Sequence, residues 1–185
     1  MKYFIGFLLS IGLIVGVFLL VLNGFKSTSK PKAPTTALVS YADTSREVQM
    51  TVVGAISADQ THNEIRITVG RSRTTMQIIQ GYNGQVLKSQ SYDNNESSYA
   101  EFLRALDLNG YTRGVKNPDL EDDRGFCATG KRYSFDIIDG ADVKQHYWTT
   151  TCSGRGNFKG NRPQIEALFD RQVPDYGTMI QGIAF

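Results

Sequence analysis

The stretch 47-EVQMTVVGAI-56 decides the fold, because its apolar side chains recur at every second position. Val48, Met50 and Val52 alternate with polar neighbours, which is the period of a strand with one buried face. The segments on either side of this stretch differ sharply from it. The chain over residues 26–36 is rich in Ser, Thr, Lys and Pro, whereas the chain after the stretch continues the alternation.

Three more strands are predicted after the first one. The pair Asn83-Gly84 tolerates the positive φ angles of a type I′ turn, so it predicts a tight hairpin between the last two strands. Together the four strands predict an antiparallel meander. The three downstream strands lie around Ile65 to Val69, Met76 to Ile78, and Val86 to Tyr92.

One helix is predicted directly after the meander. Ser98 and Glu101 have the spacing of a capping box, in which the two side chains bond to free amides of the first turn. Phe102 and Leu106 then recur at helical spacing, and Asn109-Gly110 is typical of a helix end.

A second hairpin is predicted around Asp139-Gly140. If these two residues form the turn, Ile138 pairs with Ala141, and the same register places Cys127 opposite Cys152. Facing residues at a non-hydrogen-bonded position lie close enough for a disulfide. We therefore predict that Cys127 and Cys152 are bonded, whereas the register depends on the length of the turn.

A second helix is predicted near Asn161 or Arg162, with Pro163 in its first turn and its end before Pro174. The order ββββα-ββα predicts an α+β domain in which both helices pack on one face of an antiparallel sheet. The segment Met179 to Phe185 is a candidate for a final strand.

The N-terminal segment predicts a transmembrane anchor. Tyr3 to Leu22 contains no charged residue, and at about 1.5 Å per residue it spans roughly 30 Å, the thickness of the bilayer core. A cleaved signal peptide is usually shorter, which favours a retained signal-anchor. The predicted organisation is an anchor over 1–25, a flexible linker over 26–46, and the folded domain over 47–185.

The cysteine content favours a location outside the cytoplasm. The chain has two cysteines, both in the folded part, and an even number in an exported domain indicates a disulfide. We therefore expect a single-pass protein of the cell membrane with its C-terminal domain outside the cytoplasm. Gly12 and Gly16 form a G-x-x-x-G pair within the span, which raises the hypothesis of a homodimer through the membrane helix.

Charge and motifs exclude several functions. With 20 basic and 18 acidic side chains, the chain lacks the basic excess that is typical of nucleic-acid binders. The near-matches to a phosphate loop (125–131) and to a calcium loop (117–128) each lack required residues. We therefore predict no catalytic residue, no metal site and no cofactor.

The remaining candidate for a binding site is a Gly-rich loop with three cationic residues. It lies between the second hairpin and the second helix, where an anion could be held. Two aromatic side chains of the preceding strand extend the candidate. The predicted ligand-binding residues are Arg155, Phe158, Lys159, Arg162, Tyr147 and Trp148.

Three hypotheses about function follow. The first is a non-catalytic binding or envelope-associated module whose partner is an anionic envelope polymer or a protein. The second is a hydrolase-like envelope enzyme with a cleft near His146. The third is a structural subunit that assembles through its membrane helix.

Overall fold

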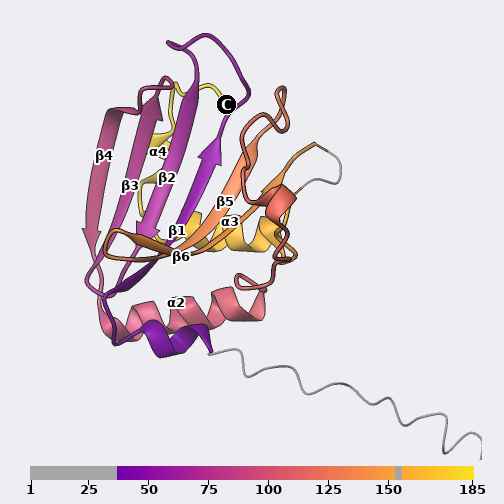
Figure 1. Cartoon of the computed structure of the whole chain (residues 1–185). Helices are drawn as coiled ribbons and strands as arrows, with labels where there is room; N and C mark the ends of the chain where they lie inside the picture. The colour runs from indigo at the N-terminus through magenta and orange to yellow at the C-terminus, as the bar shows by residue number, and fades with distance from the viewer. Residues whose placement is uncertain (1–36, 153–155) are drawn as a thin grey trace, which may run out of the picture. The chain divides into compact units, whose positions relative to one another are not determined.

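Six antiparallel strands form one sheet in the order β4-β3-β2-β1-β5-β6 (Figure 1). The structure is a computed structural model, and it describes residues 37–152 and 156–185. The predicted antiparallel sheet is thus confirmed, and the two predicted hairpins join into a single sheet because β1 pairs with β5. The strands are β1 (Arg46–Val53), β2 (Asn63–Val69), β3 (Arg73–Gln80), β4 (Gln85–Asp93), β5 (Arg132–Asp139) and β6 (Asp142–Thr150).

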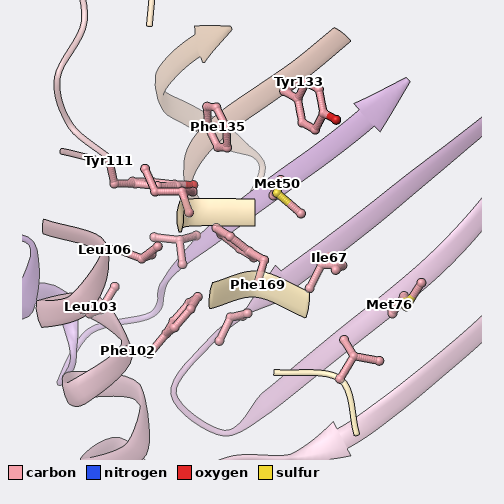
Figure 2. Close-up of a cluster of buried hydrophobic side chains, with 14 of the residues drawn as sticks. Met50, Ile67, Met76, Phe102, Leu103, Leu106, Tyr111, Tyr133, Phe135 and Phe169 are labelled. Carbon is pink, nitrogen blue, oxygen red and sulfur yellow. The ribbon is translucent and has the colours of Figure 1, made fainter. Parts of the chain in front are cut away.

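One face of the sheet carries the hydrophobic core. Helix α2 (Glu96–Leu108) and helix α3 (Arg162–Asp170) cover this face, as predicted. Figure 2 shows aromatic and aliphatic side chains of both helices directed toward the strands. Fully burying a large apolar side chain stabilises the fold by about 1.5–3 kcal/mol. Among the buried residues are Met50, Ile67, Met76, Phe102, Leu103, Leu106, Phe135 and Phe169.

Short helical segments complete the domain. The first is η1 (Leu38–Tyr41), and its Leu38 is fully buried, so packing begins earlier than the predicted boundary at residue 47. A second, η2 (Pro118–Leu120), lies in the loop before β5. The C-terminal segment contains α4 (Tyr176–Met179) and no strand, so the candidate final strand is wrong.

Helix α2 begins before the predicted capping box. Its N-cap is Asn95, whose side chain accepts a hydrogen bond from the amide of Ser98 at 3.0 Å. Ser98 is therefore inside the first turn instead of at the cap. The predicted end is confirmed, since the helix stops at Asn109 and Gly110 has a φ of 76°.

The two hairpin turns both differ from the predicted turns. The loop between β3 and β4 has four residues, 81–84, because Gln80 pairs with Gln85. The loop between β5 and β6 is Gly140-Ala141, one residue later than predicted. In each hairpin a bulge lies close to the turn, and it leaves Leu87 of β4 and Lys144 of β6 without a partner residue.

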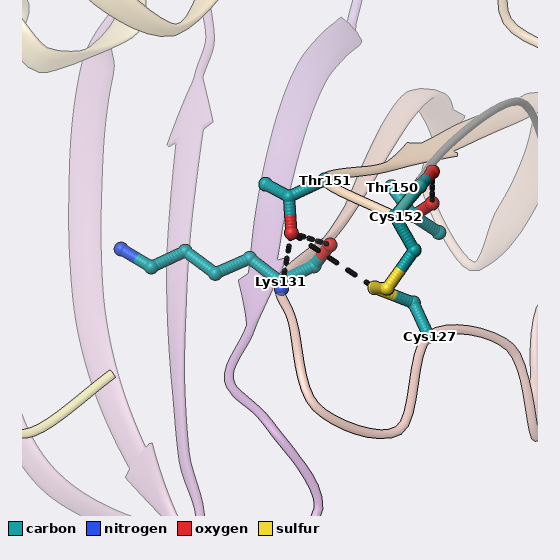
Figure 3. Close-up of a disulfide and its surroundings, with 5 residues drawn as sticks. All are labelled: Cys127, Lys131, Thr150, Thr151 and Cys152. Carbon is teal, nitrogen blue, oxygen red and sulfur yellow. Dashed lines mark hydrogen bonds between the residues drawn. A yellow bond between two sulfur atoms is a disulfide. The ribbon is translucent and has the colours of Figure 1, made fainter.

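The disulfide between Cys127 and Cys152 is present although the predicted register is wrong (Figure 3). The observed β5–β6 register, extended past Arg132 and Thr150, places Gly130 opposite Cys152. A turn in which the amide of Gly130 donates to the carbonyl of Cys127 at 3.2 Å folds the first cysteine back over this position. A Cβ atom on Gly130 would lie 2.6 Å from the Cys127 sulfur, so the bond needs glycine there.

The predicted anchor, Tyr3 to Leu22, and the pair Gly12 and Gly16 lie outside the described residues, as does most of the predicted linker. Within residues 37–152 and 156–185, no helix combines the length and the apolar character that crossing a bilayer requires. The membrane anchor therefore stays a prediction.

Candidate functional site

The loop before β5 covers the second face of the sheet at its β5–β6 end. There the loop before β5 lies over Trp148, whose side chain is fully buried. The indole N–H of Trp148 donates to the carbonyl of Leu120 at 2.7 Å, and the ring of Phe126 lies 5.0 Å from the indole. Asn157 donates to the same carbonyl at 3.2 Å. A stretch of sequence that is mostly polar is thus held against the sheet by one tryptophan.

His146 and Asp136 face each other across β5 and β6 on this second face. The Nδ1–H of His146 donates to Oδ1 of Asp136 at 2.6 Å, and the hydroxyl of Ser134 donates to Oδ2 of the same carboxylate at 3.2 Å. The side chain of Asp136 is 10% exposed and that of His146 is 36% exposed. The hydrogen bond with Asp136 raises the pKa of His146 above its usual value, and partial burial opposes this rise.

A cavity of about 610 Å³ lies between the edge of β6 and the loop before β5. Its size is in the range of sites that hold small ligands or short segments of larger ones. We call it the β6 pocket. The ring of Tyr147 contacts Gly114, where a Cβ atom would come within 2.3 Å of the ring. The lining residues are Val115, Lys116, Asn117, Glu121, Val143, Lys144, Gln145, His146, Tyr147 and Asn157.

The polar groups of the β6 pocket are suited to binding more than to covalent catalysis. Within the described ranges, no hydroxyl or thiol bonds to Nε2 of His146, and the hydroxyl of Ser134 is committed to Asp136. Both cysteines form the disulfide, so neither supplies a thiolate. In the same part of the chain, no cluster of three or more His, Cys, Asp or Glu residues could hold a metal ion.

Two carboxylates of the acidic loop before β5 are paired. Asp123 lies 2.8 Å from the Nε of Arg132, and Asp122 accepts two-pronged hydrogen bonds from Arg124. The first pair ties the loop to β5, whereas the second is exposed and lies within the loop.

The predicted ligand-binding residues are not gathered at one site. Trp148 and Phe158 are buried, at 0% and 6% exposure. Trp148 packs against the loop before β5, and Phe158 packs in the hydrophobic core.

The described cationic residues of the prediction make separate contacts. Lys159 is exposed, and its amide donates to the carbonyl of Arg113. Arg162 pairs with Glu166 at 2.7 Å. Tyr147 lines the β6 pocket. Arg155, the sixth predicted residue, lies outside the described residues.

Sequence reasoning missed Asp136, Lys116 and Lys144 as site residues. The alternation along β5 places Asp136 on the face opposite the core, so an acid on a strand was a visible signal. The predicted register, however, pairs Asp136 with Val143 and not with His146. The later turn, Gly140-Ala141, shifts the partner of Asp136 by two residues to Gln145, and the bulge at Lys144 shifts it by one more to His146. Nothing in the local sequence marks the bulge.

Comparison of the chain with protein-family models, with curated proteins and with solved structures finds no significant match.

Proposed function

We propose that this chain is a membrane-tethered binding module that acts outside the cytoplasm. Tyr3 to Leu22 anchors it, the segment up to residue 46 includes the tether, and the folded domain binds a ligand with anionic groups in the β6 pocket. The disulfide supports an exported domain, because such bonds persist in oxidising compartments.

The observation that carries the proposal is the combination of side chains in the β6 pocket. Lys116 and Lys144 are exposed basic residues of the lining, and His146 adds a third positive charge when it is protonated. Glu121 is the acidic residue of the same lining. Lys144 also pairs with Asp142 at 2.8 Å, but both partners are exposed, and such a pair is worth only about 0–1 kcal/mol. A ligand carboxylate or phosphate can therefore replace Asp142.

The first experiment is an NMR titration of the full chain in non-ionic detergent micelles. Two probes are added separately, an oligomer of glucuronate and a capped acidic peptide. We expect saturable shifts of the amide signals of Val115, Lys144 and His146 with at least one probe. The signals of Leu87 and Lys88 in the other hairpin serve as controls. Absence of saturable shifts at the three pocket amides with both probes would refute the proposed function.

A second candidate function is hydrolysis, and the His146–Asp136 hydrogen bond is the observation that favours it. In this hypothesis Asp136 orients the ring, and Nε2 takes a proton from a water molecule that attacks an acyl carbon. The test compares hydrolysis of p-nitrophenyl acetate by the wild type and by His146→Ala. A binding module gives equal rates, whereas a loss of the wild-type rate in the variant would favour the enzyme.

A further inference from the structure

The backbone at the β6 pocket offers an open strand edge. In an antiparallel pair, the N–H and C=O of a residue point either toward the partner strand or away from it, and the direction alternates along the strand. Those of Trp148 point away from β5, because its N–H donates to the side chain of Asn157 at 2.7 Å and its C=O accepts from the amide of Phe158 at 3.0 Å. The N–H and C=O of His146, two residues earlier, therefore also point outward.

The chain itself already uses part of this edge. Gly156 forms an antiparallel bridge with Thr149, so the segment Gly156 to Phe158 begins to pair with β6 as a strand would. It then turns away, since Phe158 bridges to Gly114 and the amide of Lys159 donates to the carbonyl of Arg113. Within the described residues, no group outside the β5–β6 ladder bonds to the main chain of His146.

The β6 pocket begins where this segment leaves the strand. Its lining includes Asn157 of this segment, residues 143–147 of β6 and residues 115–117 of the loop before β5. His146, whose main-chain groups are open, is therefore part of the lining of the cavity. An extended peptide placed there would continue the pairing that Gly156 to Phe158 starts.

We infer that the ligand of the β6 pocket is an extended acidic peptide segment that pairs with β6 at His146. This inference rests on the proposed function and names its partner class. Main-chain hydrogen bonds to His146 supply affinity, and alternate side chains of the peptide meet Lys116 and Lys144. The same edge groups give no reason for a saccharide to bind, because a saccharide lacks the regular spacing of amide donors and acceptors.

The charged groups around His146 come from three elements. Asp136 of β5 bonds to its ring, Lys144 belongs to β6, and the loop before β5 contributes Lys116, Glu121 and Asp123. An acidic peptide side chain adds a carboxylate near two lysines and a histidine whose positive charge Asp136 stabilises. The carboxylates of Glu121 and Asp123 disfavour it.

The test uses the full chain in detergent micelles and the peptide acetyl-Val-Glu-Val-Glu-Val-Glu-amide. Its control is the same peptide with every amide N-methylated, which keeps the charges and removes the donors. We expect the unmodified peptide to bind at least about tenfold more tightly, as expected for the loss of one good hydrogen bond. The amide signal of His146 should shift on binding. Equal affinity of the two peptides would overturn the inference.

Charge-reversal variants give a second measurement. Lys116→Glu and Lys144→Glu should each weaken the unmodified peptide by about tenfold, whereas Arg73→Glu on the other hairpin should change its affinity by less than about twofold. All three residues are exposed, so each variant should fold.

Failure of the inference can be separated from failure of the proposed function. If oligoglucuronate shifts the His146 signal and the peptide does not, the peptide inference is overturned and the binding function stands. If the peptide shifts Leu87 and Lys88 instead of His146, it binds the edge of β4 and the inference is likewise overturned.

Discussion

The hairpins β3–β4 and β5–β6 form the two ends of the same sheet and share one construction. In both, a glycine with positive φ lies in the turn, and a bulge leaves the third residue of the outer strand unpaired. Yet most of β4 is exposed, whereas β6 carries a fully buried Trp148 and lines a cavity. The hairpin itself therefore does not make the site. The site depends on the loop before β5, which covers one face of the β5–β6 hairpin and has no counterpart at β3–β4 in the part of the chain that the structure describes.

The largest expected effect concerns the contact that holds the loop. Trp148→Ala removes a fully buried indole and its hydrogen bond to Leu120, so we expect it to destabilise the domain by about 3–5 kcal/mol. Leu87→Ala, at the bulge of the other hairpin, removes a side chain that is 41% exposed and should cost less than about 0.5 kcal/mol. Urea unfolding followed by circular dichroism measures both. Equal destabilisation by the two variants would contradict the view that the covering loop distinguishes the β5–β6 hairpin from the β3–β4 hairpin.

The second prediction concerns the disulfide, which is present in one hairpin only. Replacing Cys127 and Cys152 together by Ser should lower the free energy of unfolding by about 3 kcal/mol, since the bond closes a loop with a sequence separation of 25. The bond ties the end of the covering loop, at Cys127, to the chain just after β6, so amide hydrogen exchange should rise in residues 114–131 and β6 when it is lost. Unchanged exchange there, with faster exchange in β4, would show that the bond does not stabilise the covering loop.

The third prediction compares the two turns directly. Gly140 has a φ of 63° and Gly84 a φ of 73°, and a Cβ atom would meet nothing within 4 Å at either position. Gly140→Ala and Gly84→Ala should each cost about 1 kcal/mol, because an L side chain is strained in this region. Similar losses in thermal unfolding would confirm that the turns are equivalent. A much larger loss of stability for Gly140→Ala would show that the turns themselves contribute to the difference between the two hairpins.

The smallest expected effect is the pH dependence that Asp136 gives to β6. Because the hydrogen bond raises the folded-state pKa of His146, the stabilisation is fully present below the unfolded-state pKa and is lost as pH rises through the folded-state pKa. Asp136→Asn should lower the pKa of His146, as followed by NMR of the ring protons. It should also remove this part of the stability at acidic pH. An unchanged pKa in the variant would refute the role of the carboxylate.

Much of the fold could be predicted because period-two alternation and helix signals are local. The strands, α2 and α3 follow from such patterns, and α3 begins with Asn161 as the N-cap, as expected. The cysteine pair was also predictable, since only two cysteines exist. One feature of the fold was not local. The covering of the second face depends on Phe126 and Leu120 reaching Trp148 from a loop that appears solvated in sequence.

The candidate site was harder to predict because it depends on register. His146 was visible as a candidate, but its partner Asp136 is found only once both the position of the turn and the bulge at Lys144 are known. The burial of Trp148 was missed for a related reason. A strand pattern gives the face on which Trp148 lies, but it does not show that a loop covers that face.

Lys88 gives the outer edge of β4 a different property. It lies on an edge strand, yet its ammonium group is directed inward, donating to the carbonyl of Met179 at 3.0 Å and more weakly to that of Gln181. An inward-directed charge on an edge strand is a known obstacle to further strand pairing. A sheet with two receptive edges can propagate into a fibre, whereas a sheet with one can only form a finite complex. With β4 blocked in this way, strand addition at β6 would give a one-to-one assembly, even at the high local concentrations that tethering to a surface produces.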